Sequence, residues 1–311
     1  RSLILPPPPA AGPGVAVLRI EGVLVDGDSA APPGPLPVPL VGDGRSGDRT
    51  VVEQARRLVD DDAVAAVVVH IDSPGGSATA SEAMAAALER VAARKPVVAH
   101  FGSMAASGGY YVATAAQRIV AQPSTLTGSI GVVTGKLVAG ALWERLGIAR
   151  EVLARGGGTA LFDADTPWTA ADRARIDGHV RRVYDVFLAR VATARALPLE
   201  ALDAVAGGRV FTGRQAQERG LVDDLGTLDD ALALARRLAG VSSRAPAREV
   251  RPPRRRRLPA AAGAGLAALT GDAGAAAAAV YVLDTLRRLN GAAALCVCPW
   301  IDGPSSPPGL G

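Results

Sequence analysis

The chain has 311 residues, of which 49% are apolar, and a formal net charge of +4. This length suits one large or two modest domains with a sizeable core. The basic excess is partly local, at Arg251 and residues 254–257, so the charge gives little reason to expect nucleic-acid binding. No run of 18 uncharged apolar residues is present, which argues against a membrane-spanning helix in this sequence.

The first half of the chain predicts alternating strands and helices. Residues 1–14 are proline-rich and typical of a linker, and residues 27–49 indicate an irregular loop. The apolar run 64–71 ends at a glycine turn, as expected of a strand covered on both faces. The next helix is expected to open at Thr79, with Glu82 three residues later in a capping-box pattern. The other elements predicted here are strands at 15–25 and 97–101 and a helix at 51–60.

The second half continues the alternation. A long helix over 169–195 is expected to begin at Thr169 and Asp172, and it carries an apolar stripe. Its neighbours are predicted as strands at 118–121, 130–133 and 150–153 and as helices at 137–147, 198–205 and 227–239. This order indicates an α/β domain with a largely parallel sheet. From residue 241 an arginine cluster and alanine- and glycine-rich segments indicate a tail, with one short helix at 278–290.

The two cysteines, Cys296 and Cys298, are one residue apart. Cysteines at this spacing are poorly placed to pair with each other, and no other Cys or His is nearby to complete a metal site. We therefore expect two plain thiols, no metal and no cofactor.

Ser107 is the most informative residue of the sequence. It lies in FGSMAASGGYYVATAA, residues 101–116, directly after a predicted strand and before Gly108 and Gly109 at a predicted helix start. A helix N-terminus offers oriented N–H groups to a developing oxyanion, and Gly108 lets a carbonyl approach the backbone closely. A helix N-cap serine gives the same pattern, so this segment alone leaves both interpretations open.

A second glycine turn, IDSPGGS at residues 71–77, follows the predicted strand 64–71 and contains Gly75 and Gly76. Such a turn can aim an N–H group outward, as an oxyanion hole requires, or it can be an ordinary strand-to-helix connection. It lacks the spacing and the lysine of a phosphate-binding P-loop. One turn can hold a nucleophile and the other can stabilise an oxyanion, so acyl transfer is the leading interpretation.

Four segments occur in one order: IDSPGGS, MAASGGYY, TGSIGV and GRVFTGRQAQERGLVDDLG. Together they resemble the signal peptide peptidase A family of serine proteases over roughly residues 15–240. The resemblance implies a Clp protease/crotonase-like fold of repeated β-β-α units with a largely parallel sheet. It also implies a peptidase with a Ser-Lys dyad.

The resemblance assigns roles to individual residues. It implies that Ser107 is the nucleophile and that the N–H groups of Gly76 and Gly108 are the oxyanion donors, with Gly75 and Gly109 as the supporting turn residues. It further implies that a second serine, Ser129 in the TGSIG turn, orients the dyad lysine.

This chain departs from the family pattern at the general base. Short family members carry the lysine about fifty residues after the nucleophile, where this chain has ARGGGTALFDAD, residues 154–165. Thr159 stands about where the lysine is expected, and Arg155 cannot act as a base because a guanidinium stays protonated. Lys136 is a weak substitute, as the one lysine downstream of Ser107. Three histidines, His70, His100 and His179, are further candidates in principle. The sequence suggests structural roles for His70 and His100 and a surface role for Lys95.

Long tandem members of the family take the serine from their C-terminal half and the lysine from their N-terminal half. This chain resembles such a C-terminal half, and it begins with Arg and without a signal-peptide pattern. We therefore expect the lysine from an upstream homologous domain or from a neighbouring subunit. A desolvated lysine of lowered pKa can serve as the general base.

The sequence thus predicts a serine endopeptidase domain at 15–240, between a linker at 1–14 and a tail at 241–311. The expected partners are membrane-derived or signal peptides and further copies of the chain, and the expected location is membrane-associated with the catalytic domain on the extracytoplasmic side. Two alternatives stay open: an inactive peptide-binding or assembly module of the same fold, and an acyl-CoA enzyme of the crotonase type.

Overall fold

The computed structural model describes residues 12–32, 44–153, 155, 158, 161–202, 204–251, 280–282, 284–285 and 295–297. Its centre is a mainly parallel sheet whose strands run in the order β10-β7-β6-β4-β1-β11. These strands are β1 (Gly14–Glu21), β4 (Val64–Ser73), β6 (Val97–Ala106), β7 (Arg118–Ala121), β10 (Asp224–Leu225) and β11 (Ala247–Glu249). Two short strands extend it at the end of β6, where β8 (Leu126–Gly128) pairs with β6 and, antiparallel, with β9 (Val210–Thr212).

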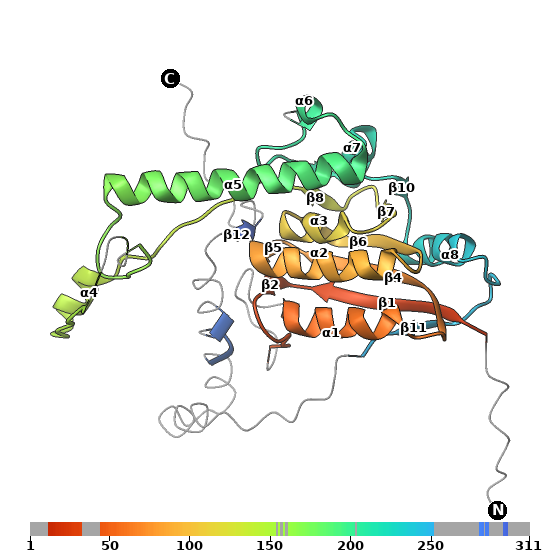
Figure 1. Cartoon of the computed structure of the whole chain (residues 1–311), viewed down its shortest axis with the longest axis horizontal. Coiled ribbons are helices and arrows are strands. Elements are labelled where there is room, and N and C mark those ends of the chain that lie inside the picture. Colours follow the sequence, from red (N-terminus) through yellow and green to blue (C-terminus); the bar gives the residue numbers. More distant parts are fainter. Residues whose placement is uncertain are drawn as a thin grey trace, which may run out of the picture.

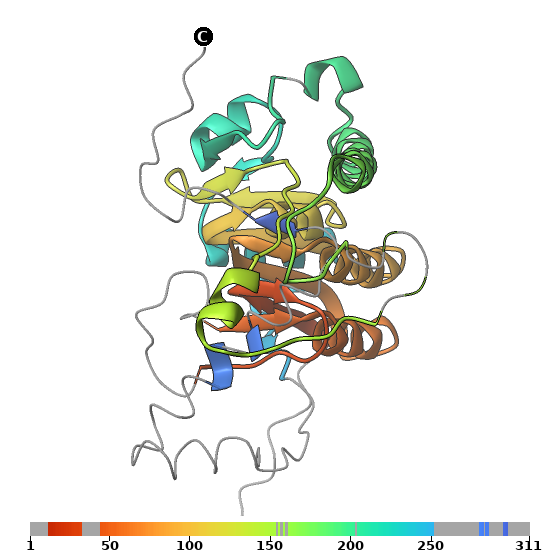
Figure 2. The same cartoon turned by 90° about the vertical axis from the view of Figure 1, so that its left-hand side faces the viewer.

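Helices cover both faces of this sheet, and alternate residues of each strand face them. Val67 and Val69 of β4 pack into the core under α1 (Asp48–Val59) and α2 (Ala78–Ala92). Ala66 and Val68 pack instead against α8 (Leu228–Leu238). Figures 1 and 2 show α1 and α2 side by side along one face. The continuous apolar run 64–71 is therefore a strand buried on both faces, as predicted.

A second, small sheet adjoins the end of β4. Its strand order is β12-β5-β2-β3, with β2 (Val23–Val25), β3 (Arg45–Gly47), β5 (Gly75–Ser77) and β12 (Leu295–Val297). The chain leaves β4 at Ser73 and enters β5 at Gly75, so one proline separates the two sheets. The glycine turn of residues 71–77 therefore lies where the two sheets meet.

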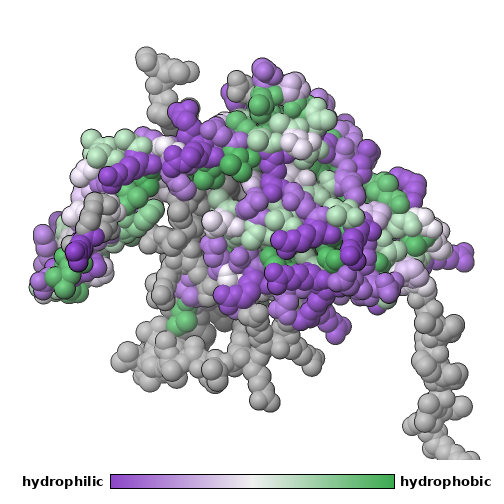
Figure 3. Space-filling view, viewed as in Figure 1, coloured by the Kyte–Doolittle hydropathy of each residue, from purple (hydrophilic) through white to green (hydrophobic). Residues whose placement is uncertain are grey.

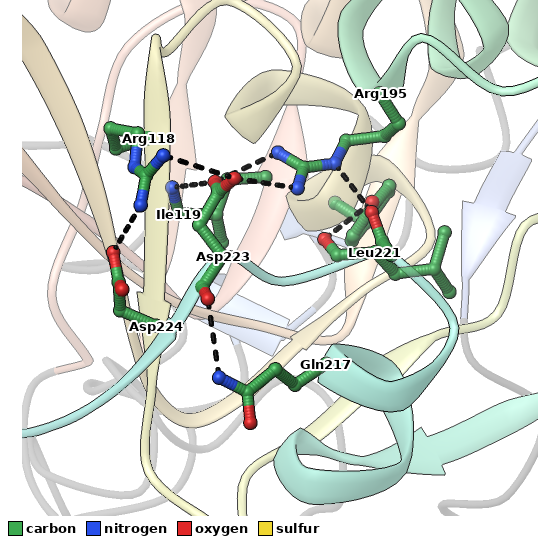
Figure 4. Close-up of polar contacts among 9 residues, drawn as sticks. Arg118, Ile119, Arg195, Gln217, Leu221, Asp223 and Asp224 are labelled. Carbon is green, nitrogen blue, oxygen red and sulfur yellow. Dashed lines mark hydrogen bonds and ion pairs between the residues drawn. The ribbon is translucent and has the colours of Figure 1, made fainter.

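The long helix α5 (Ala170–Arg195) lies over one end of the sheet (Figure 1). It opens with the predicted capping box between Thr169 and Asp172. Its other end is fixed by Arg195, whose guanidinium donates two hydrogen bonds of 2.9 Å to the Asp223 carboxylate (Figure 4). Asp223 also accepts from the N–H of Ile119 in β7, so this ion pair joins the helix to the sheet. Two short helices, α6 (Leu199–Leu202) and α7 (Gly213–Glu218), follow.

An arm formed by the described residues between 132 and 168, which include α4 (Gly140–Arg145), stands away from the body (Figure 1). Several of its large apolar side chains are exposed; Leu137 is 80% and Leu153 is 90% accessible. Figure 3 shows apolar surface on this arm. None of the helices described in the structure combines the length and the apolarity that crossing a bilayer requires.

Several boundaries differ from the sequence expectation. The cap of α2 is Ser77, whose hydroxyl accepts from the N–H of Ala80, and not Thr79. Residues 130–133 form no strand, and Ile130 makes an isolated bridge with Ala206. Residues 150–153 lie in the arm without strand structure. Helix α4 is shorter than the predicted 137–147, and β11 adds a strand to the main sheet beyond residue 240.

Parts of the expected organisation lie outside the described residues. These are residues 1–11 of the linker, the arginines at 254–257, Thr159 and Cys298. Residues 280–282 and 284–285 are helical, within the range predicted for the tail helix.

Candidate active site

Ser107 sits at the turn from β6 into α3 (Gly108–Ala113), fully buried. Its backbone has φ 51° and ψ −112°, a combination that L-residues rarely adopt. It occupies the N-cap position, yet its side chain makes no capping hydrogen bond. The ordinary N-cap interpretation therefore lacks its defining contact. Backbone strain of this kind costs roughly 1–3 kcal/mol and is concentrated at functional sites.

The TGSIG turn lies directly against Ser107. The N–H of Ser107 donates to the carbonyl of Gly128 (2.9 Å), and its hydroxyl points to the carbonyl of Gly131 at 3.4 Å. Ser129 between them is 1% exposed, has a positive φ of 49° and donates its N–H to the carbonyl of Arg209 (2.7 Å). The fold thus brings together Ser107 and Ser129, which are 22 positions apart in the sequence.

The other glycine turn is held in a conformation that requires glycine. The N–H of Gly75 donates to the hydroxyl of Ser73 (3.1 Å), which in turn donates to the carbonyl of Gly22 (2.6 Å). Gly76 has φ 154°, and a Cβ there would lie 2.1 Å from the carbonyl oxygen of Leu24. The N–H of Gly75 is therefore already engaged. Sequence reasoning did not single out Ser73, although its place before the proline of SPGG was a signal.

Helix α3 packs against this turn. A Cβ on Gly109 would lie 3.1 Å from the carbonyl oxygen of Ser73, so any larger residue would require that carbonyl to move by a few tenths of an ångström. Gly108 is the first residue of α3, where N–H groups have no acceptor within the helix. The structure thus places the Ser107–Gly109 turn against the end of β4. A buried hydroxyl beside free helix N–H groups suits attack on a carbonyl and stabilisation of its oxyanion.

A cavity of about 650 Å³ adjoins the serine pair. Ser129, Gly131 and Gly208 line it on one side, and Asp177, Arg181 and Tyr184 of α5 line it on the other. Its hydroxyl, carbonyl and carboxylate oxygens are acceptors of the kind that bind an ammonium group. Gly131 lines the cavity, and its carbonyl also faces the Ser107 hydroxyl, so this one residue lies between the cavity and the nucleophile.

Helix α3 is fixed by two tyrosines that follow Ser107. The hydroxyl of Tyr110 donates to the carbonyl of Leu221 (2.8 Å), and that of Tyr111 donates to Glu82 of α2. Burial, then the hydrogen bond to Glu82, raises the pKa of Tyr111, so this tyrosine is a hydrogen-bond donor and not a base. Arg190 of α5 pairs with Glu82 and lies over the Tyr111 ring. Glu82 therefore connects three helices and plays no part in a capping box.

The candidate bases have other contacts. The ammonium of Lys136 lies over the Trp168 ring, 5.8 Å from its centroid. That of Lys95 donates to the carbonyls of Leu58 and Asp61 at 2.7 Å. In the described part of the chain, the hydrogen bond of the Ser107 hydroxyl goes to a backbone carbonyl and not to a lysine, histidine or carboxylate.

His70 and His100 pair with each other. Their Nδ1 atoms are 2.9 Å apart, and their rings are stacked with centroids 5.1 Å apart. Burial, followed by the charge of His70, lowers the pKa of His100 to about 4. Both side chains are on the α8 face of the sheet, in register between β4 and β6. Among the described residues no group of three or more His, Cys, Asp or Glu side chains is placed to hold a metal ion.

Residues 89–242 match Peptidase family S49. The "Putative protease slr0021" of Synechocystis sp. is 36% identical over 196 residues, which are 63% of this chain and 71% of the relative. This chain belongs to peptidase family S49. The mixed α/β fold with a largely parallel sheet agrees with the Clp protease/crotonase-like fold of that family. The S49 match includes Ser107 and Ser129, whereas the Gly75–Gly76 turn precedes it.

Two further S49 relatives differ in length from this chain. "Serine protease SPPA, chloroplastic" of Arabidopsis thaliana is 38% identical over 61% of this chain, but the alignment spans just 28% of the plant protein. The "Putative signal peptide peptidase SppA" of Enterococcus faecium is 33% identical over 58% of this chain and 52% of its own length. The chain therefore covers between about a quarter and three quarters of these relatives.

Proposed function

We propose that this chain is the nucleophile-bearing part of a serine endopeptidase, with its peptidase domain at residues 15–240. The observation that supports this most directly is the buried Ser107 at a strained strand-to-helix turn beside the cavity. Its hydroxyl would attack the scissile carbonyl of a peptide, and the N–H groups of Gly108 and Gly76 would stabilise the oxyanion. The name of the Arabidopsis thaliana relative as a serine protease supports the same reaction class.

The general base is proposed to be a lysine that enters the cavity from a homologous domain or from another copy of the chain. Ser129 and Tyr184 offer hydroxyl oxygens to its ammonium, and Asp177 offers a carboxylate. Arg181 at the same cavity would disfavour a second positive charge and so lower the pKa of that lysine, whereas the Asp177 carboxylate would raise it; the base requires that the effect of Arg181 and of burial exceeds that of Asp177. The exposed apolar arm supports assembly, because several large apolar side chains exposed together on one segment favour burial against a partner.

The proposed substrates are membrane-derived or signal peptides. The name of the Enterococcus faecium relative supports this substrate class. An apolar peptide released from a membrane would be met most readily by an enzyme at that membrane, so we propose a membrane-associated protein with this domain on the extracytoplasmic side. Cell fractionation followed by protease accessibility of the intact cells tests that location.

Labelling with a fluorophosphonate probe tests the proposal, because the probe reacts with an activated serine. The chain is compared with Ser107→Ala, with Thr159→Lys, which places a lysine where short family members have one, and with Thr166→Lys as a control for added charge in the same arm. We expect slow labelling of the parent chain, none for Ser107→Ala, and labelling at least tenfold faster for Thr159→Lys alone.

Each contrary outcome has a definite meaning. Labelling that persists in Ser107→Ala would remove Ser107 as the nucleophile. Fast labelling of the parent chain that Thr159→Lys leaves unchanged would locate the base within the chain or across its self-assembly, and would point back to Lys136. No labelling of any variant, even with the complete gene product, would leave an inactive module of the same fold.

A further inference from the structure

Strand β6 contains a bulge shortly before it reaches the proposed nucleophile. Ile71 of β4 is paired with Phe101 of β6. The next pair joins Ser73 to Ala105, so β4 advances by two positions while β6 advances by four. The extra residues of β6 therefore lie in the segment 102–104. Bulges bend the strand that contains them, and they are frequent next to active sites, where they re-aim a side chain.

The carboxylate of Asp72 holds this bulge from the side of β4. Its Oδ1 atom accepts the N–H of Met104 at 3.0 Å and the hydroxyl of Ser103 at 2.7 Å. Gly102 permits this approach, because a Cβ at that residue would lie 2.8 Å from Cγ of Asp72 and would push the carboxylate away. Hydrogen bonds to a charged acceptor are roughly twice as strong as neutral ones. Two residues of the bulge are thus bound to one oxygen atom.

The bulge also marks where β6 changes its partner. Residues 98–101 pair with β7, whereas residues 104–106 pair with β8. The buried hydroxyl of Thr125, the residue before β8, donates to the carbonyl of Gly102 at 2.7 Å. The N–H of Ser107 donates to the carbonyl of the last residue of β8 at 2.9 Å. The bulge and Ser107 are both bound to the β8 segment, so a shift of the bulge is transmitted to the turn that holds Ser107.

Asp72 contacts the other half of the candidate site through its neighbours in the chain. The next residue is Ser73, whose hydroxyl accepts from the N–H of Gly75 and donates to the carbonyl of Gly22. The N–H of Gly22 in turn donates to the carbonyl of Asp72 at 2.9 Å. The main chain of Asp72 therefore supports the glycine turn, while its side chain supports the strand that leads to Ser107.

We propose that Asp72 is a positioning residue of the peptidase site, which fixes the bulge of β6 and thereby the place of the Ser107 hydroxyl relative to the Gly75–Gly76 turn. This inference rests on the proposed function of Ser107. Asp72 acts through the backbone of residues 102–104 and is not among the described residues that line the cavity. A displacement of about 1 Å at a reacting group can cost about 10²-fold in rate. Loss of Asp72 therefore affects the rate of the chemical step and not the binding of the reagent.

Labelling kinetics separate these two quantities. The fluorophosphonate concentration is varied with the Thr159→Lys chain, which gives a maximum labelling rate constant and a half-saturating concentration. Asp72→Ala removes both hydrogen bonds to the bulge, whereas Asp72→Asn keeps an acceptor oxygen at the same place. Val68→Ala is the matched control, because Val68 is a fully buried residue of the same strand that contacts the α8 face, away from the bulge.

We expect Asp72→Ala to lower the maximum rate constant at least tenfold and to leave the half-saturating concentration within twofold. Asp72→Asn should stay within threefold of the parent in both quantities. Val68→Ala should stay within twofold in both, although its melting temperature falls. Ser103→Ala, which removes one of the two hydrogen bonds, should slow labelling about threefold and serves if Asp72→Ala does not fold.

Three results would overturn the inference. The first is equal labelling by Asp72→Ala and Val68→Ala, because the bulge would then hold without the carboxylate. The second is labelling of Asp72→Asn as slow as that of Asp72→Ala, because the acceptor geometry would then not matter. The third is a raised half-saturating concentration with an unchanged maximum rate constant, because Asp72 would then act on binding.

Amide hydrogen exchange at residues 102–107 provides a second measurement that needs no catalysis. Exchange should become faster in Asp72→Ala than in Val68→Ala and should be unchanged in Asp72→Asn. If no protein is labelled, the parent included, the proposed function fails, and exchange alone decides whether Asp72 holds the bulge. If the parent is labelled and Asp72→Ala is labelled equally fast, the inference fails and the proposed function stands.

Discussion

The backbone conformation of Ser107 leads to a prediction about stability. With φ at 51° and ψ at −112°, Ser107 occupies a region that glycine enters without steric cost. Ser107→Ala and Ser107→Gly both delete the hydroxyl, and they differ in the Cβ alone. Comparison of these two variants therefore isolates the cost of holding a side chain in this conformation.

The magnitude follows from three contributions. Gly in place of Ala gives the unfolded chain more freedom, which costs about 0.4–1 kcal/mol. The buried methyl group is worth about 0.8 kcal/mol. Relief of backbone strain returns roughly 1–3 kcal/mol at Ser107. The neighbouring Ala106 is equally buried but is not among the residues of positive φ, so Ala106→Gly carries the first two costs without the third.

Urea unfolding followed by circular dichroism provides the measurement, with the slope m required to be the same for all variants. We expect the step from Ala to Gly at Ser107 to be at least about 1 kcal/mol more favourable than the same step at Ala106. If both steps cost the same, the turn at Ser107 stores no strain, and the argument that links its conformation to catalysis loses its physical basis.

Three other changes have definite expected outcomes. Asp223→Asn should lower the free energy of unfolding by about 3 kcal/mol, because Arg195 is 8% exposed and loses its charged partner. The surface change Asp60→Asn, which removes the partner of Arg94, should lower it by about 0.5 kcal/mol or less. Equal losses in urea unfolding would refute the claim that the buried ion pair matters more than the exposed one. The pKa of His100 is lowered to about 4, so neutral His100 contributes to the stability of the folded protein fully above about pH 6.5, and this contribution is lost as the pH falls toward 4. The free energy of unfolding should therefore fall between pH 7 and 4.5, and His100→Gln should reduce that fall by roughly 2 kcal/mol. Parallel curves of stability against pH for the two proteins would contradict this. Gly76→Ala should lower the melting temperature by several degrees and abolish Ser107 labelling, because its Cβ would lie 2.1 Å from a backbone carbonyl oxygen; a normal labelling rate would exclude the turn from the site.

The sequence predicted those elements whose signals are local. The capping box of α5 depends on Thr169 and Asp172 alone, and the buried strand β4 depends on its own apolar run. The cap of α2 was predicted two residues too late, at Thr79 and not at Ser77, because the tertiary fold decides between the two hydroxyls. Asp26 binds the hydroxyls of both Thr79 and Ser77, and it is Ser77 that also accepts from the helix.

Pairings between distant segments could not be predicted. β11 joins β1 across more than 200 positions, and β12 joins β5 across a similar separation. Residues 150–153 have a strand-like composition, but they lie in the exposed arm, where the structure gives them no strand partner. At the candidate site, motif order identified Ser107 and Ser129, but their positive φ and the contact with the Gly131 carbonyl follow from packing.

The histidine pair also marks the alignment of two strands. β4 leads to the Gly75–Gly76 turn and β6 leads to Ser107, so their relative shift sets the distance between the two halves of the site. A slip of one residue would turn His100 to the opposite face, into the apolar core under α2, and would leave the Nδ1 of His70 without its partner. Only the observed register joins the two imidazoles. The histidine pair therefore specifies the register of two strands, as a single buried Asn specifies the register of the helices in a coiled coil.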